Sequence, residues 1–155
     1  MIHIYYGFGK GKTTAAIGCG IRAAGAGFKV SLVQFLKDDK SSELNALDFD
    51  IFKSPHNLPF HPDCSYQKWV DGAVNYIMHS DSDMIILDEF LDVIDSFVSL
   101  DTALDILAKL SDKEIIITGH KLIEELNAKA DYVTCFEKIK HPFDDGISAR
   151  KGIEY

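Results

Sequence analysis

Three glycines, two lysines and two threonines lie close together near the beginning of the chain, in the segment Tyr5-Tyr6-Gly7-Phe8-Gly9-Lys10-Gly11-Lys12-Thr13-Thr14. An apolar, strand-like run precedes this segment and a helix-forming run follows it. A glycine-rich turn that enters a helix presents free backbone N–H groups and the positive end of the helix dipole, and both favour bound phosphate. In such turns a lysine reaches the phosphates and a threonine hydroxyl binds Mg²⁺. The segment therefore predicts a site for the phosphates of ATP, with Mg²⁺ beside them.

The spacing of this turn is Gly7-x-x-x-Gly11-Lys12-Thr13, one residue shorter than the common GxxxxGK[ST] pattern. We expect the glycines to allow the turn, Lys12 to contact the phosphates as a point charge, and Thr13 to bind the metal ion. The alternative is that the glycines only end a strand and that Lys12 is solvated. Because a strand pattern, a helix pattern and an intact GKTT coincide here, phosphate binding is the better interpretation.

Two carboxylates, Asp88 and Glu89, follow the apolar run Met84–Leu87. This is the end of a strand at which α/β folds place catalytic groups. In many P-loop proteins a carboxylate at such a position completes the Mg²⁺ shell, directly or through water. A solvated strand end is the alternative, and the residues alone leave the choice between Asp88 and Glu89 open. Arg22 lies about three helical turns after Lys12 and could face either the sheet or solvent.

Strand and helix patterns alternate along the chain, which is typical of βαβ units with a mostly parallel sheet and predicts the α/β class. Strands are expected at residues 2–6, 29–36, 49–52, 84–87, 114–118 and 132–136. Helices are expected at residues 12–26, 41–47 (capped by Ser41 or Ser42), 66–79, 102–110 and 121–129. The proline-rich segment 54–62 and the tail 140–155 are expected to be irregular. Trp69 belongs to an apolar helical stripe that predicts core packing.

The length and composition of the chain limit the classes of protein to which it can belong. The 155 residues fit one domain, and no apolar run is long enough to span a membrane. The net charge of −8 disfavours nucleic acids as partners, since binding to their backbone depends largely on lysine and arginine. The first residues form neither a basic leader nor an apolar export segment, so we expect a cytoplasmic protein.

The three cysteines are widely spaced and odd in number, and we interpret them as reduced thiols. Cys19 and Cys135 lie in apolar segments and are expected to be buried. Cys64 follows His61 by three positions, but a structural zinc site needs four ligands, so no zinc is expected there.

Taken together, these segments resemble the P-loop ATP:corrinoid adenosyltransferases, which modify cob(I)alamin or cob(I)yrinic acid a,c-diamide. The resemblance runs nearly end to end. It rests on YGFGKGKTTAAIG (6–18), IRAAGAGFKV (21–30), VQFLK (33–37), ILDE (86–89), ITGH (117–120), ADYVT (130–134) and KHPFDDGISARKGIEY (140–155). The shortened P-loop and the C-terminal segment are the most specific of these.

The resemblance implies a RecA-like P-loop NTPase fold, with helices on both faces of the sheet, that binds MgATP with the triphosphate as leaving group. A Co(I) corrinoid would attack the 5′-carbon of ATP, and the protein would mainly orient the reactants and stabilise the departing charge. No side chain is expected to act as a nucleophile or as a general acid or base. Cobalamin biosynthesis or salvage would be the setting.

Site residues carried over by position fall into three groups. ATP and Mg²⁺ would be held by Gly7, Phe8, Gly9, Lys10, Gly11, Lys12, Thr13 and Thr14, with Arg22 assisting at the polyphosphate. Thr13, Glu89 and Asp88 would serve the metal ion, with Glu89 the favoured carboxylate. Phe60 and Trp69 are the candidates for contact with the corrinoid, although core packing for Trp69 and a loop anchor for Phe60 explain them equally well. The expected protein partners are an electron-donating flavoprotein and a second copy of the chain that would cover the open site.

This chain differs from the usual family pattern at Tyr6 and Phe8, where Thr and Asn are usual, and at His120, where Arg is usual. Members also commonly carry a helical N-terminal extension, whereas this sequence begins at the first predicted strand. Two alternatives are therefore kept. One is a RecA-like ATPase in which Glu89 polarises water, and the other is a non-catalytic relative that binds ATP or a corrinoid.

Overall fold

A single six-stranded sheet forms the centre of the structure, a computed structural model that describes residues 1–59 and 61–154. All strand pairs are parallel, and the strand order is β3-β2-β4-β5-β1-β6. The strands are β1 (Ile2–Tyr6), β2 (Val30–Gln34), β3 (Asp50–Phe52), β4 (Met84–Asp88), β5 (Glu114–Gly119) and β6 (Tyr132–Cys135). The predicted α/β class and parallel sheet are confirmed.

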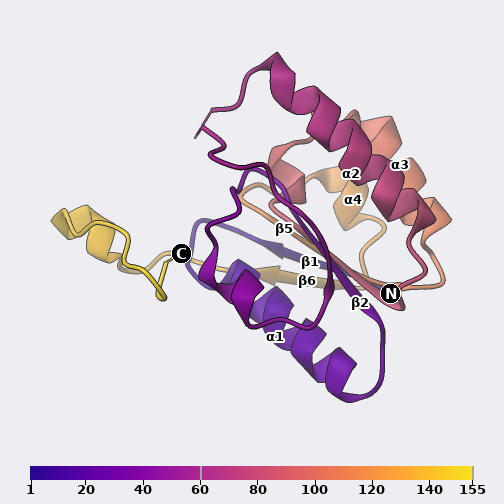
Figure 1. Ribbon diagram of the computed structural model, residues 1–155, viewed down its shortest axis with the longest axis horizontal. Coiled ribbons are helices and arrows are strands. Elements are labelled where there is room, and N and C mark those ends of the chain that lie inside the picture. The colour runs from indigo at the N-terminus through magenta and orange to yellow at the C-terminus, as the bar shows by residue number, and fades with distance from the viewer. Residues whose placement is uncertain (60, 155) are drawn as a thin grey trace.

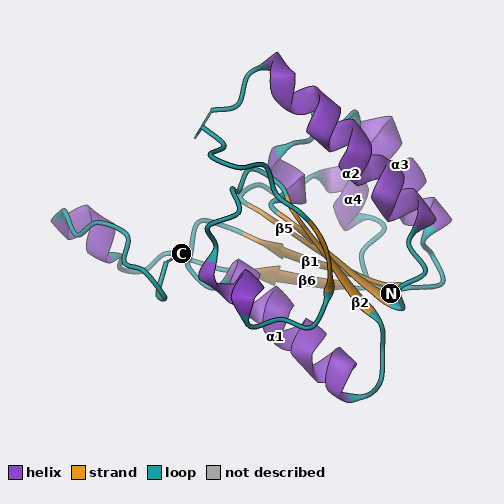
Figure 2. Ribbon diagram, in the orientation of Figure 1, coloured by secondary structure: helices purple, strands orange, loops and turns teal. Residues whose placement is uncertain are grey.

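Helices cover both faces of this sheet, as Figures 1 and 2 show. Helix α1 (Lys12–Gly25) lies on one face, and α2 (Gln67–His79), α3 (Leu100–Lys109) and α4 (Glu124–Asn127) lie on the other. Side chains alternate accordingly along β4, where Ile86 packs toward α1 and Leu87 packs into the core beneath α2 and α3. In the described part of the chain, no helix combines the length and apolarity needed to cross a membrane.

The strands in the middle of the sheet are buried on both faces. Every residue of β2 and β4 is buried, which explains why their sequences are nearly continuous in apolar residues. The expectation that the second strand lies inside the sheet is confirmed, because β2 lies between β3 and β4. Parallel strands end at the same edge, so the segments that follow β1, β2, β4 and β5 meet there.

Two expected helices are much shorter than the sequence suggests. Residues 41–47 form only a 3₁₀ turn, Ser42–Asn45, and the hydroxyl of Ser41 makes no capping hydrogen bond. The last helix is one turn, α4, because Leu122 and Ile123 instead pack against the core before it begins, Ile123 in an extended conformation. Local helix propensity yields at both places to tertiary packing.

The cysteines are free thiols, as expected, but the expected burial of Cys135 is wrong. Cys19 is half-buried, whereas Cys64 and Cys135 are exposed. Strand β6 forms an edge of the sheet, and all four of its residues are exposed. An apolar sequence therefore did not indicate a covered strand in this case.

Candidate nucleotide-binding site

A cleft of about 900 Å³ opens at the edge of the sheet where the strands end. The loop between β1 and α1 forms one side of it, and Lys37, Glu89 and His120 reach it from the segments after β2, β4 and β5. The C-terminal tail lies beyond the same edge and contributes further lining residues (Figure 1). Most of the residues assigned to ATP from the sequence line this cleft: Phe8, Gly9, Lys10, Gly11, Lys12, Thr13 and Thr14.

The glycines of the loop are required by close backbone approaches. Gly7 has φ +114°, and a Cβ there would lie 2.4 Å from the carbonyl oxygen of Phe136. At Gly9 a Cβ would lie 2.7 Å from the same oxygen. Both glycine N–H groups donate to backbone carbonyls, Gly7 to His120 at 3.1 Å and Gly9 to Phe136 at 2.7 Å. The loop is thereby fixed to the chain that follows β5 and β6.

The start of α1 supplies the free donors. Gly11, with φ +113°, precedes the helix, and no side chain caps it. The N–H groups of Lys12, Thr13 and Thr14 have no intrahelical acceptor in the first turn, and all three residues line the cleft. This arrangement suits an anion, as expected for a phosphate-binding loop.

Lys12 folds back over the loop that precedes it. Its ammonium donates to the carbonyl oxygens of Gly7 at 2.7 Å and Gly9 at 3.0 Å. Burial lowers the pKa of Lys12, against the opposing effect of Glu89, Asp92 and Asp88. The ammonium is thus positioned above the loop, at the wall of the cleft.

Asp88, at the end of β4, is the carboxylate of the site that accepts hydrogen bonds from the largest number of side chains. Its side chain is 1% exposed and accepts hydrogen bonds from Thr118 at 2.7 Å, Thr13 at 2.9 Å, Lys37 at 2.6 Å and Gln34 at 3.2 Å. Burial by itself would raise the pKa of Asp88, but the Lys37 ammonium and the two threonine hydroxyls outweigh it and hold the pKa below its usual range. Asp88 therefore remains an anion.

Glu89 differs from its neighbour Asp88 in backbone conformation and in the direction of its pKa shift. Its backbone is left-handed, with φ +57°, and its N–H donates to the Thr118 hydroxyl at 2.8 Å. The side chain reaches the cleft and lies 3.8 Å from the Lys37 ammonium. Burial raises the pKa of Glu89 to about 7, with Lys37 opposing and Asp88 adding to the shift.

These residues fit a hard divalent cation. The Thr13 hydroxyl and the Asp88 carboxylate lie within 3.1 Å of each other, and oxygen ligands of these kinds are the ones Mg²⁺ takes beside substrate phosphates. Among the residues that the structure describes, no group of three or more His, Cys, Asp or Glu side chains is arranged to hold a metal ion.

Phe8 and His120 lie together at the cleft. Their ring centroids are 5.4 Å apart, and Phe8 is 65% exposed. Asp92 holds His120 in place: it accepts the His120 backbone N–H at 3.1 Å, and its other oxygen is 2.9 Å from Nδ1. Tyr6 packs at the edge of the core instead.

The C-terminal tail folds back to the phosphate-binding loop. Gly152, Ile153 and Glu154 line the cleft, and the Lys10 ammonium contacts the Ile153 carbonyl and, at 3.3 Å, the Glu154 carboxylate. Arg150 pairs with the same carboxylate at 3.1 Å, and this hydrogen bonding lowers the pKa of Glu154 to about 2. Lys10 thus lines the cleft but is engaged by the tail.

Among the described residues assigned to ligands from the sequence, four do not line the cleft: Gly7, Arg22, Trp69 and Asp88. Asp88 instead contacts Thr13 and Lys37, which do line it. Arg22 is exposed on α1, ten residues and roughly 15 Å along the helix from Lys12. Trp69 stacks on Tyr66 with a centroid distance of 5.1 Å, donates from Nε1 to the Lys53 carbonyl at 3.0 Å and packs against the core. Phe60 lies outside the described residues.

Sequence reasoning missed Lys37, Thr118 and Gln34 as members of the site. Each is placed by a strand: Thr118 lies in β5, Gln34 ends β2, and Lys37 follows shortly after. The signal available was that polar residues interrupt or follow apolar strands at the edge where Asp88 was already expected.

Comparisons with known proteins agree with the resemblance found in the sequence. A model of the family described as ATP:corrinoid adenosyltransferase BtuR/CobO/CobP matches residues 1–155. A corrinoid adenosyltransferase of Escherichia coli K12 is 31% identical, and the match covers 100% of this chain and 85% of that protein. The corrinoid adenosyltransferase CobA of Salmonella typhimurium gives the same identity and coverage. One from Pseudomonas aeruginosa is 28% identical, covering 98% of this chain and 82% of the relative. The chain belongs to the ATP:corrinoid adenosyltransferase family.

Proposed function

We propose that this protein transfers the 5′-deoxyadenosyl group of ATP to a Co(I) corrinoid and releases triphosphate, in the synthesis or salvage of cobalamin. The electron pair of Co(I) would form the bond to C5′, while the C5′–O bond breaks and its electrons leave with the triphosphate. Family membership supports this reaction class. The observation that connects this reaction to particular residues is the cleft lined by Lys12 and Thr13 in the first turn of α1, with Asp88 within hydrogen-bond distance of Thr13.

The chain's own residues would bind and stabilise rather than react. Co(I) is already a strong nucleophile, so the rate would depend on the orientation of the two substrates and on stabilising the departing charge. The N–H groups at residues 12–14 and the Lys12 ammonium would hold the triphosphate. Placing the leaving group against the helix N-terminus means that its growing charge meets donors that are already in position.

We assign the Mg²⁺ position to Thr13 and Asp88, with Glu89 on the side of this position that faces the cleft. A bound Mg²⁺ would neutralise part of the charge on the triphosphate. Asp88 is the better direct ligand because it lies within hydrogen-bond distance of Thr13, whereas Glu89 projects into the cleft and could act through water. Gly7, Phe8, Gly9, Lys10, Gly11 and Thr14 complete the proposed ATP site. Arg22 would assist only if the polyphosphate or a partner chain approached α1.

Further proposals concern the corrinoid and the partners. Phe60 and Trp69 remain candidates for corrinoid contact. Reduction of a Co(II) corrinoid to the Co(I) substrate requires a one-electron donor, and a flavoprotein could supply that electron. We further propose a cytoplasmic protein whose residues 1–155 form one domain, and a homodimer in which a second copy covers the cleft.

The test combines the protein anaerobically with ATP, Mg²⁺ and a chemically reduced corrinoid. The expected result is equimolar adenosylated corrinoid and triphosphate. Orthophosphate released in the absence of corrinoid would favour the ATPase alternative, in which Glu89, with its pKa near 7, would polarise water. Tight binding of ATP and corrinoid with neither product would favour a binding protein and contradict the proposed reaction.

A further inference from the structure

Lys37 lies where a metal ion would be expected. Its ammonium is 2.6 Å from the Asp88 carboxylate and 2.9 Å from the Thr13 hydroxyl, and it is 3.8 Å from Glu89. It therefore contacts all three residues that were assigned to Mg²⁺. The Lys37 side chain is 21% exposed and lines the cleft, so it has open space to move into.

The backbone directs Lys37 to this place. Leu36, just before it, has a left-handed conformation with φ +53°, which is uncommon for a residue that is not glycine. The Leu36 N–H donates to the buried Tyr66 hydroxyl at 3.0 Å, and the Phe35 N–H donates to the Asp88 carbonyl at 2.9 Å. The chain after β2 is thus held in a bend that brings Lys37 back over Asp88.

An ammonium and a divalent ion cannot share these oxygens. The Thr13 hydroxyl donates its hydrogen to Asp88 and accepts from Lys37, whereas Mg²⁺ would need that same oxygen as a ligand. With ligand distances of about 2.1 Å, the ion would lie within about 5 Å of the present ammonium position, and like charges would repel strongly in this buried setting.

We propose that Lys37 is an exchangeable counter-cation of the site. In the absence of nucleotide it neutralises Asp88, and when MgATP binds it yields this position to the metal and moves to the phosphate oxygens. The proposal rests on the proposed function, because it assigns the metal and the triphosphate to this cleft. Its consequence is that triphosphate and metal assist each other's binding through Lys37, since the triphosphate gives the displaced ammonium a new partner.

The first experiment measures metal binding without nucleotide. Mn²⁺ is the probe because it accepts the oxygen ligands that Mg²⁺ accepts and its free ion is quantified by EPR. Lys37→Met should bind Mn²⁺ about tenfold or more tightly than the original protein, because no ammonium has to be displaced. The matched control is Lys40→Met, which removes the same charge three residues away; Lys40 instead contacts Asp38 and Asn57. It should change Mn²⁺ affinity by less than about twofold.

The second experiment measures coupling. The ratio of Mn²⁺ dissociation constants without and with inorganic triphosphate should fall about tenfold in Lys37→Met and stay unchanged in Lys40→Met. Direct attraction between metal and triphosphate is common to all three proteins and cancels in this comparison. Lys37→Arg, which keeps the charge, should retain more of the coupling than Lys37→Met, and a purely structural role for Lys37 would not affect this ratio.

Equal or weaker Mn²⁺ binding by Lys37→Met, or an unchanged coupling ratio, overturns the exchange. Should Lys37→Met fail to fold, Lys37→Gln retains donors for Asp88 without the charge and is subject to the same two criteria. Neither experiment uses a corrinoid or turnover. A parent protein that binds neither Mn²⁺ nor triphosphate therefore contradicts the proposed function, whereas one that binds both without the Lys37 effect contradicts only the exchange.

Discussion

Four donors from three segments of the chain converge on the carboxylate of Asp88. Thr13 comes from the first turn of α1, Gln34 and Lys37 come from the end of β2 and the residues that follow it, and Thr118 comes from β5. A buried carboxylate needs such partners because an unpaired charge in the interior is costly. The need to keep Asp88 ionised therefore explains why hydrogen-bond donors occupy these four positions.

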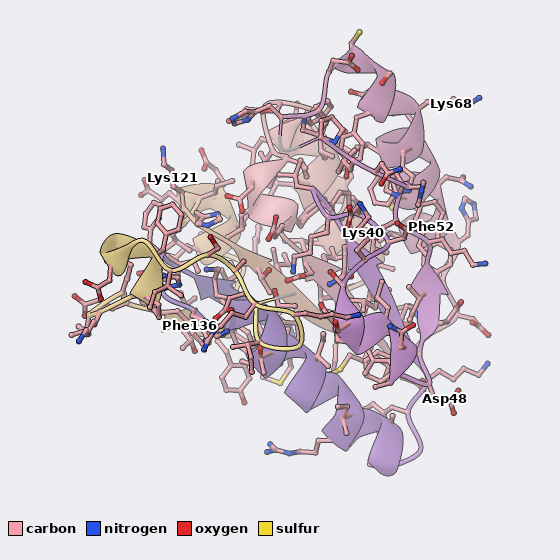
Figure 3. The ribbon with its side chains drawn as sticks, turned by 60° about the vertical axis from the view of Figure 1, so that its left-hand side comes forward. Lys40, Asp48, Phe52, Lys68, Lys121 and Phe136 are labelled. Atoms are coloured by element: carbon pink, nitrogen blue, oxygen red, sulfur yellow. The ribbon has the colours of Figure 1, made fainter. Side chains whose placement is uncertain are left out.

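Lys12→Ala is expected to weaken MgATP binding by about ten- to a hundredfold, because a charge-assisted hydrogen bond contributes about 1.5–3 kcal/mol. Calorimetry with MgATP measures this, and circular dichroism should show an unchanged fold. Lys68→Ala is the control, since Lys68 points away from α2 into solvent (Figure 3). Equal affinities of Lys12→Ala and the parent would mean that Lys12 is not a phosphate ligand.

Thr118→Val is expected to destabilise the protein by about 1–3 kcal/mol, as measured by urea unfolding. The hydroxyl donates to Asp88 and accepts the Glu89 N–H, so valine removes one of the donors to Asp88 and takes away the acceptor of the Glu89 N–H, at nearly constant volume. Thr134→Val on the exposed strand β6 should change stability by less than about 0.5 kcal/mol. A loss at position 118 no larger than at position 134 would show that the bridge is unimportant.

At the level of helices and strands, the pattern of apolar residues predicted the elements that are buried in the core. Apolar runs located the buried strands, and glycine, lysine and threonine at fixed spacing located the phosphate-binding loop. The prediction was wrong where packing overrode local preference, as at Ile123 before the one-turn helix α4. It was also wrong at Cys135, because an apolar strand at the edge of a sheet has the sequence of a covered one.

Glycines of the loop and of α1 should respond oppositely to substitution. Gly18→Ala is expected to stabilise the protein by about 0.5–1 kcal/mol, since a Cβ there meets nothing within 4 Å and alanine favours the helix. Gly7→Ala is expected to cost about 1–3 kcal/mol through its positive φ and its collision with Phe136. Thermal unfolding measures both. If Gly7→Ala matched Gly18→Ala, the loop would not be held as the structure shows.

At the scale of the whole molecule, strand order decides which residues meet. Strand β5 lies between β1 and β4, so Thr118 can bridge the end of β4 while Thr13, 75 residues from Asp88 in the chain, still reaches it across the loop. A single sequence contains no signal for this order, and for that reason Lys37 could be read only as a residue after a strand. The same holds for the tail, whose return to the loop depends on contacts rather than on periodicity.

We expect the C-terminal tail to be bound only weakly to the phosphate-binding loop, through the contacts of Lys10 with Ile153 and Glu154. Lys10→Met should raise the rate of tryptic cleavage after Arg150 and Lys151, but by no more than about fivefold, because ion pairs between exposed groups contribute little. Mass spectrometry of the initial products separates these cuts from others. Unfolding by urea should be unchanged, since the residues that detach are largely exposed.

Cleavage of the tail should also depend on bound nucleotide. Because Gly152–Glu154 line the same cleft as Lys12, bound MgATP should slow the tail cuts in the parent protein but not in Lys12→Ala, which binds it poorly. Glu154→Gln should behave like Lys10→Met, as it weakens the same contact from the other side. Cleavage that neither substitution accelerates and that MgATP leaves unchanged would show that the tail does not close on the cleft in solution.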